Sequence, residues 1–209
     1  MKILVACEFS GTVRDAFAAQ GHDAWSCDLL PSERPGQHYQ GEVEDIIEEG
    51  WDLMIAHPPC TFLCSSGLHW NKRRPERAVQ THEAMLFVFS LLDAPIPMIA
   101  LENPIGCISS NYRKPDQIIQ PYQFGHPESK ATCLWLKGLP VLIPTNILTK
   151  PDSGRWDNQT ASGQNKLTPS ADRWKERSRT YQGIADAMAA QWGQLAIKAI
   201  ENSNRGAYD

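Results

Sequence analysis

This sequence of 209 residues lacks several features that would place it in a known class of protein. No apolar run approaches the length of a membrane span, and the N-terminal apolar stretch is too short for a secretory signal. The six cysteines form neither a C-x-x-C pair nor a zinc ligand set. The G-x-G-x-x-G fingerprint of dinucleotide-binding units is also missing. We therefore expect a cytoplasmic protein with reduced thiols, no metal and no membrane contact.

The composition is that of an ordinary soluble protein. Hydrophobic residues make up 42% of the chain and charged residues 21%, which excludes a disordered, collagen-like or low-complexity chain. A chain of this length can bury a core without disulfides. We expect residues 1–209 to form a single domain.

The net charge of -4 points to no particular partner, but the charges are unevenly distributed. Residues 1–68 carry 3 basic against 11 acidic side chains, whereas residues 69–77 carry 4 against 1 and residues 150–179 carry 7 against 4. The two basic segments could present a positive face to a polyanion. Charge counts alone favour two solvated loops.

Strand-like and helix-like segments alternate along the chain. We expect strands at 3–7, 24–27, 51–56, 97–101, 118–119 and 132–136, helices at 12–20, 77–92 and 181–200, and loops at 31–40, 61–76 and 149–179. The last helix would place Ile184, Met188, Trp192, Leu195 and Ala199 on its apolar side. This alternation predicts an α/β fold, a doubly wound and mostly parallel sheet with helices on both faces.

The unusual residues fall where the predicted strands end. They are Phe9-Ser10-Gly11, Asp28, Pro58-Pro59-Cys60 and Glu102-Asn103-Pro104. Ligands of open α/β sheets bind beyond the carboxyl ends of the strands. Two prolines fix the backbone before Cys60, as suits a nucleophile, although an isolated Pro-Pro-Cys is more often structural. Glu102 follows an apolar strand, so we expect a raised pKa and a role in proton donation; a capping or ion-paired carboxylate is the alternative.

In this order, these motifs resemble those of the cytosine-5 DNA methyltransferases. Asp45-Ile46 matches the family's Asp-Ile pair, and residues 179–192 resemble its last motif, which returns to the cofactor site. The similarity covers residues 1–107 and 178–200 and is greatest to the short versions found in phage and prophage genomes. The resemblance implies a Rossmann-like S-adenosylmethionine-dependent methyltransferase fold. It also implies a location in the cytoplasm of a bacterial or phage-infected cell.

The resemblance implies a covalent mechanism. Cys60 would attack carbon 6 of a flipped-out cytosine in DNA, Glu102 would hold or protonate nitrogen 3, and Asn103 would shape the pocket. Carbon 5 would then take a methyl group from S-adenosyl-L-methionine. The residues implied in binding this cofactor are Phe9, Ser10, Gly11, Asp28, Leu29, Asp45, Ile46 and Pro58.

The chain also departs from the family pattern. No segment matches the family's Gln-x-Arg-x-Arg element, so Arg177, Arg179 or Lys130 would supply that positive charge. The large target-recognition domain is missing, which leaves residues 141–178 as a rudimentary recognition region. Nucleic-acid contacts are expected from Trp70, Lys72, Arg73, Arg74, Arg77, Arg177 and Arg179.

Three alternatives remain open from the sequence. The substrate could be a free nucleotide or a single-stranded nucleic acid. The second alternative is methylation of an amino group, but this requires an Asp/Asn/Ser-Pro-Pro-aromatic motif, which His57-Pro58-Pro59-Cys60 does not match. An inactive nucleic-acid-binding protein that keeps the fold is the third. His57 itself could be a base, although a histidine at a strand end is more often a scaffold residue.

Overall fold

The computed structural model describes residues 1–162 and 165–195. Its centre is one seven-stranded sheet with the order β3-β2-β1-β4-β5-β7-β6. The strands are β1 (Lys2–Ala6), β2 (Asp23–Asp28), β3 (His38–Gln40), β4 (Leu53–Ala56), β5 (Met98–Pro104), β6 (Gln117–Ile119) and β7 (Thr132–Lys137). Among the described strands, β7 runs antiparallel to both of its neighbours, β5 and β6, and all other pairs are parallel. The predicted fold class, a doubly wound and mostly parallel sheet, is therefore confirmed.

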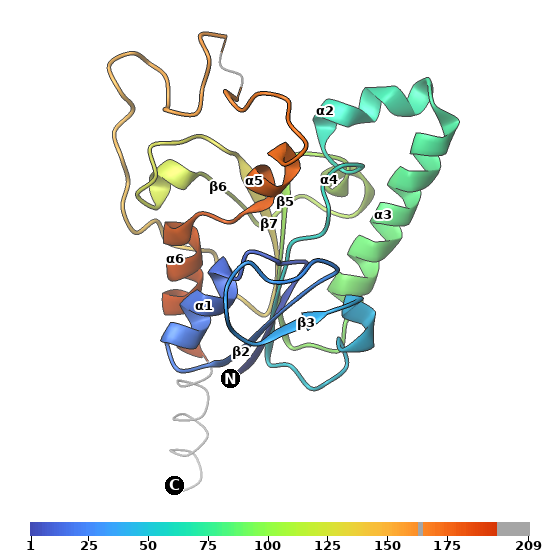
Figure 1. Ribbon diagram of the computed structural model, residues 1–209, viewed down its shortest axis with the longest axis vertical. Helices are drawn as coiled ribbons and strands as arrows, with labels where there is room; N and C mark the ends of the chain where they lie inside the picture. The colour runs from blue at the N-terminus through green and yellow to red at the C-terminus, as the bar shows by residue number, and fades with distance from the viewer. Residues whose placement is uncertain (163–164, 196–209) are drawn as a thin grey trace, which may run out of the picture.

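Six α-helices accompany the described sheet. They are α1 (Thr12–Ala19), α2 (Ser65–Leu68), α3 (Pro75–Asp93), α4 (Ile108–Asn111), α5 (Arg173–Ser178) and α6 (Gln182–Trp192). Helices α1 and α6 lie side by side on one face of the sheet, and α3 covers the other (Figure 1).

Each buried strand divides its side chains between two cores. Leu4 and Ala6 of β1 point to the core under α3, whereas Ile3 and Val5 point to the core under α1 and α6. Because successive side chains of a strand alternate in direction, a sheet covered on both faces needs continuous apolar runs. The sequence supplies them, and all four residues of β4 are fully buried.

Several predicted loops contain regular structure. Residues 31–40 end in β3, residues 61–76 contain α2 and a 3-10 helix at His69–Lys72, and residues 149–179 contain α5. Strand β5 runs on to Pro104 because β7 pairs with it there, with Glu102 opposite Leu134 and Asn103 opposite Cys133. Local sequence patterns do not predict these short elements, because the elements are stabilised by contacts with segments that are distant in the chain.

The last predicted helix is present from Gln182 to Trp192. Its extension over residues 196–200, with Ala199, lies outside the described residues. The single domain over residues 1–209 and the recognition role of residues 141–178 remain predictions. Within the described part of the chain, no helix is long and apolar enough to cross a membrane.

Candidate active site

A cavity of about 670 Å³ lies at the carboxyl ends of the central strands. Its floor comes from the segments after β1 and β4 and from the end of β5, which contribute Phe9, Cys60 and Glu102 among others. Its other walls are residues 128–131, 158, 165–167 and 176–181. The end of α5 and the segment that follows it thus lie across the cavity from the strand ends that hold the predicted nucleophile.

Cys60 follows β4 in a tight turn, and its carbonyl oxygen accepts hydrogen bonds from the amides of Leu63 and Cys64, each at 3.0 Å. The residue is exposed to the cavity, yet surrounding protein atoms desolvate the thiol. Burial therefore raises its pKa, helped by Cys64 and Glu102, while the charges of Lys130 and Arg177 lower it. The resting sulfur is thus a thiol that positive charge can convert to a thiolate.

Glu102 is paired with His57, whose Nδ1 lies 2.9 Å from its Oε2. Burial raises the pKa of Glu102, but the hydrogen bond and charge of His57, with Lys130 and Thr132, outweigh it, so the pKa lies below its usual range. The expectation of a raised pKa is therefore wrong. The apolar strand that precedes Glu102 predicts the burial but not the basic partners around it.

Two buried polar atoms of this site have no hydrogen-bond partner among the described residues. Asn103 donates from Nδ2 to the Pro58 carbonyl at 2.8 Å, but its Oδ1 is unpartnered, as is Nε2 of His57. Both residues line the cavity. An unsatisfied buried acceptor or donor costs about 1–3 kcal/mol, so these atoms favour a polar ligand in the cavity.

Positive charge reaches the cavity from Lys130 and Arg177. Nζ of Lys130 donates to the Arg177 carbonyl at 2.7 Å and lies 5.8 Å from the centre of the Tyr181 ring. Both charges act on the Cys60 thiol. Arg179 instead forms two hydrogen bonds to Glu33, at 3.0 and 2.6 Å. Of the three candidates, Lys130 and Arg177 are therefore the ones whose charge reaches the sulfur.

The turn after β1 forms the other end of the cavity, with Phe9 and Ser10 in its wall. The Phe9 ring lies 6.0 Å from that of Trp174 on α5. Gly11 has φ 70°, and a Cβ there would lie 2.5 Å from the Arg14 guanidinium. This position therefore requires glycine on both conformational and steric grounds.

Glu8 occupies the N-terminus of α1. Its carboxylate accepts the amides of Val13 at 2.7 Å and Arg14 at 3.2 Å, and the Ser10 hydroxyl at 3.1 Å. In dinucleotide-binding units a phosphate takes this place. The buried carboxylate excludes a second anion from the same amides.

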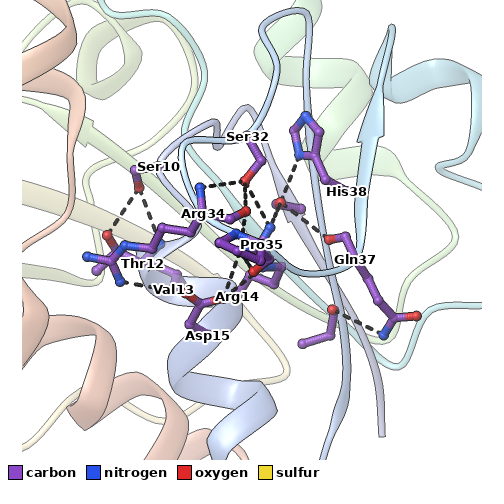
Figure 2. A network of polar contacts seen from close by, with 12 residues as sticks. Ser10, Thr12, Val13, Arg14, Asp15, Ser32, Arg34, Pro35, Gln37 and His38 are labelled. Carbon is purple, nitrogen blue, oxygen red and sulfur yellow. Dashed lines mark hydrogen bonds and ion pairs between the residues drawn. The ribbon is translucent and has the colours of Figure 1, made fainter.

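Arg14 ties this turn to the segment after β2 (Figure 2). Its side chain is 1% exposed, and its guanidinium donates to the hydroxyls of Ser26 and Ser32 and to the carbonyls of Arg34 and Pro35. These bonds fix the loop that carries Glu33, whose amide in turn donates to the Phe9 carbonyl at 2.8 Å. The network therefore holds the cavity wall rather than lining it.

The remaining predicted cofactor residues divide into two groups. Pro58 lines the cavity, whereas Gly11, Asp28, Leu29, Asp45 and Ile46 are not among its lining residues. Asp28 ends β2, accepts the Leu30 amide at 2.9 Å, and contributes to the raised pKa of the cavity-lining thiol of Cys7. Leu29 is exposed, Asp45 accepts the Tyr39 hydroxyl at 2.9 Å, and Ile46 is buried. The second group flanks or lies beyond the cavity edge.

In the basic segment after Cys60, three side chains point to solvent and one, that of Arg77, binds the protein itself. Lys72, Arg73 and Arg74 are exposed, and the guanidinium groups of both arginines lie within 6 Å of the half-exposed Trp70 ring, at 5.7 and 5.2 Å. Arg77 instead donates to the carbonyls of Thr61 and Gly67. It therefore braces the turn that carries Cys60.

The sequence patterns assign His57 and Lys130 only minor roles, although both lie in the site. His57 stands three residues before Cys60, and Lys130 lies just before β7. Only the antiparallel pairing of β7 with β5 brings Lys130 to Glu102. Across residues 1–162 and 165–195, no group of three or more His, Cys, Asp or Glu side chains could hold a metal ion.

No protein-family model and no curated protein matches this chain. Among solved structures it is similar to a prophage-encoded E. coli protein whose name assigns it as a DNA modification methyltransferase, with 16% sequence identity and a TM-score of 0.44. The similarity covers 69% of this chain and 51% of that one, so this chain spans about half the length of that protein. A similarity of this size assigns no activity to this chain.

Proposed function

We propose that this protein is an S-adenosylmethionine-dependent methyltransferase that modifies carbon 5 of cytosine in DNA through a covalent adduct with Cys60. The observation that carries the proposal is one cavity that holds the Cys60 thiol, the Glu102 carboxylate and the Asn103 amide beneath the positive charge of Lys130 and Arg177. The resemblance of the sequence motifs to cytosine-5 methyltransferases supports the same chemistry.

The turn after β1 fits this cofactor better than it fits a dinucleotide. Glu8 already neutralises the amides at the start of α1, so a phosphate would meet a carboxylate there. A cofactor whose reactive end is a cationic sulfonium is not repelled by that carboxylate. Phe9 offers an aromatic face, and Asp28, which commits one carboxylate oxygen to the Leu30 amide, can accept a ribose hydroxyl on the other.

In this mechanism the chain's own groups activate the base. The Cys60 thiolate, stabilised by Lys130 and Arg177, adds to carbon 6, while a proton delivered to nitrogen 3 from Glu102 neutralises the charge that the addition would leave on the ring. Carbon 5 thereby becomes a nucleophile, and the cofactor supplies an electrophilic methyl group. Asn103 holds the Pro58 carbonyl and so fixes the turn before Cys60.

DNA is the substrate best matched by the exposed basic segment that follows Cys60 in the chain. Lys72, Arg73 and Arg74 are exposed next to Trp70, and basic side chains with an aromatic ring suit phosphates and an unstacked base. A free nucleotide would have no use for this second positive surface.

The test is product analysis with the purified protein. It is incubated with labelled S-adenosylmethionine and duplex DNA, single-stranded DNA or cytidine nucleotides, and the nucleosides are separated by mass spectrometry. The proposal predicts 5-methylcytosine in DNA and none with Cys60→Ser; Cys64→Ser, the neighbouring thiol, is the matched control and retains product. Product at the exocyclic amino group, or none from any substrate, would refute it.

A further inference from the structure

The pairing of His57 with Glu102 raises a question of proton supply. Glu102 has to deliver a proton to nitrogen 3, but its pair with His57 keeps it a carboxylate at rest. A carboxylate cannot act as an acid until another group protonates it. The proton must therefore be held elsewhere in the site.

His57 is the group placed to hold it. Its Nδ1 lies 2.9 Å from Oε2 of Glu102, within direct proton-transfer distance, and the histidine side chain is only 8% exposed. Its backbone is fixed as well, because its amide donates to the Ala6 carbonyl at 2.9 Å. Both side chains line the cavity that holds Cys60. The ring is thus largely buried and in direct contact with the carboxylate that has to be protonated.

The second ring nitrogen supports this assignment. Nε2 of His57 is buried and has no hydrogen-bond partner among the described residues. A histidine that served only as a scaffold would have both nitrogens satisfied by protein groups, as buried polar atoms usually are. An unpartnered nitrogen leaves the ring able to gain and lose a proton.

We propose that His57 holds the one mobile proton of the site at rest and passes it through Glu102 to nitrogen 3 of the bound pyrimidine. The inference rests on the proposed function and adds to it a positioning residue that acts through Glu102.

The step balances without an external acid. The S–H bond of Cys60, an exposed residue, is broken and its proton passes to water. The sulfur then forms a bond to carbon 6, and the π pair of the carbon 5–carbon 6 bond moves to the carbon 4–carbon 5 bond. The π pair of the carbon 4–nitrogen 3 bond moves to nitrogen 3, which binds a proton that Glu102 relays from Nδ1 of His57. When the thiolate leaves, nitrogen 3 returns its proton through Glu102 to His57, the hydrogen lost from carbon 5 goes to water, and the sulfur regains a proton from water.

The experiment measures hydrogen exchange at carbon 5 in D₂O without cofactor. Addition of Cys60 makes carbon 5 enamine-like, so deuterium enters there whether or not a methyl donor is present. Exchange is followed by mass spectrometry of the DNA cytosines, and kcat and KM for methylation are measured in parallel. Wild-type protein without exchange and without methylation refutes the proposed function, and with it the inference.

The variants test His57 itself. His57→Asn keeps an N–H donor toward Glu102 but cannot carry a proton, so exchange and kcat should fall about 100-fold or more with KM unchanged. His22→Asn, at the opposite end of the sheet, is the control and should behave as wild type. An active wild type whose His57→Asn variant exchanges at the wild-type rate overturns the inference alone.

A second variant tests the proton-carrying role of His57 in a protein whose restored activity shows that it is folded. His57→Ala leaves a space for a small ring, and added imidazole should restore exchange. Pyrazole has the same size and an N–H donor but is too weak a base to carry a proton at neutral pH, so it should not restore exchange. Equal restoration by both rings would show that His57 only fills space and would contradict the proposal.

Discussion

At the scale of single residues, the site works by setting charges against burial. Burial raises the pKa of the Cys60 thiol, and Lys130 and Arg177 oppose that increase. Burial also raises the pKa of Glu102, but there the basic partners prevail. The same cavity thus keeps Cys60 protonated and Glu102 ionised at rest, which is the reverse of the states in which they react, so both groups have to change protonation state before the addition.

Lys130 gives the clearest test of this balance. Its positive charge favours the thiolate, so Lys130→Ala should raise the pKa of Cys60 further and move the rise of activity with pH toward alkaline values. The rate at neutral pH should fall, and more base should recover it. Lys130→Arg keeps the charge and serves as the control. A pH–rate profile unchanged by Lys130→Ala would mean that this charge does not act on the sulfur.

Asp28 tests the cofactor assignment, because it lies beside the cavity rather than in its lining. A hydrogen bond to a charged group contributes about 1.5–3 kcal/mol, so Asp28→Ala should weaken S-adenosylmethionine binding about tenfold or more. Calorimetric titration measures the dissociation constant directly. An equal dissociation constant for Asp28→Ala and wild type would place the ribose elsewhere.

At the scale of elements, strand ends hold the site and loops close it. The segments after β1 and β4 and the end of β5 bring Phe9, Cys60 and Glu102 to one edge, as expected for parallel strands. The turn after β1 is fixed by Glu8 at the start of α1 and by Arg14 against the next loop. Rigid supports of this kind keep reactive groups within the small tolerances that catalysis needs.

The prediction at this scale concerns the contribution of Arg14 to stability. Arg14→Ala removes a buried guanidinium that donates to the buried Ser26 hydroxyl, the half-buried Ser32 hydroxyl and the carbonyls of Arg34 and Pro35, so the free energy of unfolding should fall by about 3 kcal/mol. Denaturant titration measures the loss. Arg34→Ala, which removes a half-exposed arginine of the same loop, should cost under about 1 kcal/mol. Equal losses for the two variants would show that the network adds nothing to stability.

The sequence predicts the parallel core and the strand-end motifs because both produce recognisable patterns over a few consecutive residues. Apolar runs mark β1 and β4, and prolines mark the turn before Cys60. It does not predict α5, β3 or the partners of Glu102, because these depend on contacts between distant segments. His57 meets Glu102 across 45 positions, and Arg179 meets Glu33 across 146. No single-sequence periodicity records such pairs.

At the scale of the whole molecule, an acidic chain presents basic surface in selected places. The net charge is -4, yet Lys72, Arg73 and Arg74 are exposed beside Trp70. Arg77 does not belong with them, because it holds carbonyl oxygens of the turn that carries Cys60. A test of DNA binding should therefore change the three outward residues and leave Arg77 intact.

Neutralising Lys72, Arg73 and Arg74 together should weaken binding to all DNA sequences alike. Each phosphate contact contributes about 0.9 to the slope of log K against log salt, so three lost contacts should flatten the slope by up to about 2.7. Fluorescence anisotropy at several salt concentrations measures it, with cofactor affinity as the control for folding. A slope that the triple change does not alter would remove this surface from the DNA site.

The most direct test of the central claim is to trap the adduct on Cys60. A DNA strand containing 5-fluorocytosine is incubated with the protein and S-adenosylmethionine, and the product is digested and analysed by peptide mass spectrometry. Fluorine cannot leave carbon 5 as a proton does, so the sulfur should remain bonded to carbon 6 after methyl transfer. The account predicts a methylated fluorocytosine nucleotide attached to Cys60 and to no other cysteine. An active enzyme that leaves Cys60 unmodified on this substrate would contradict it.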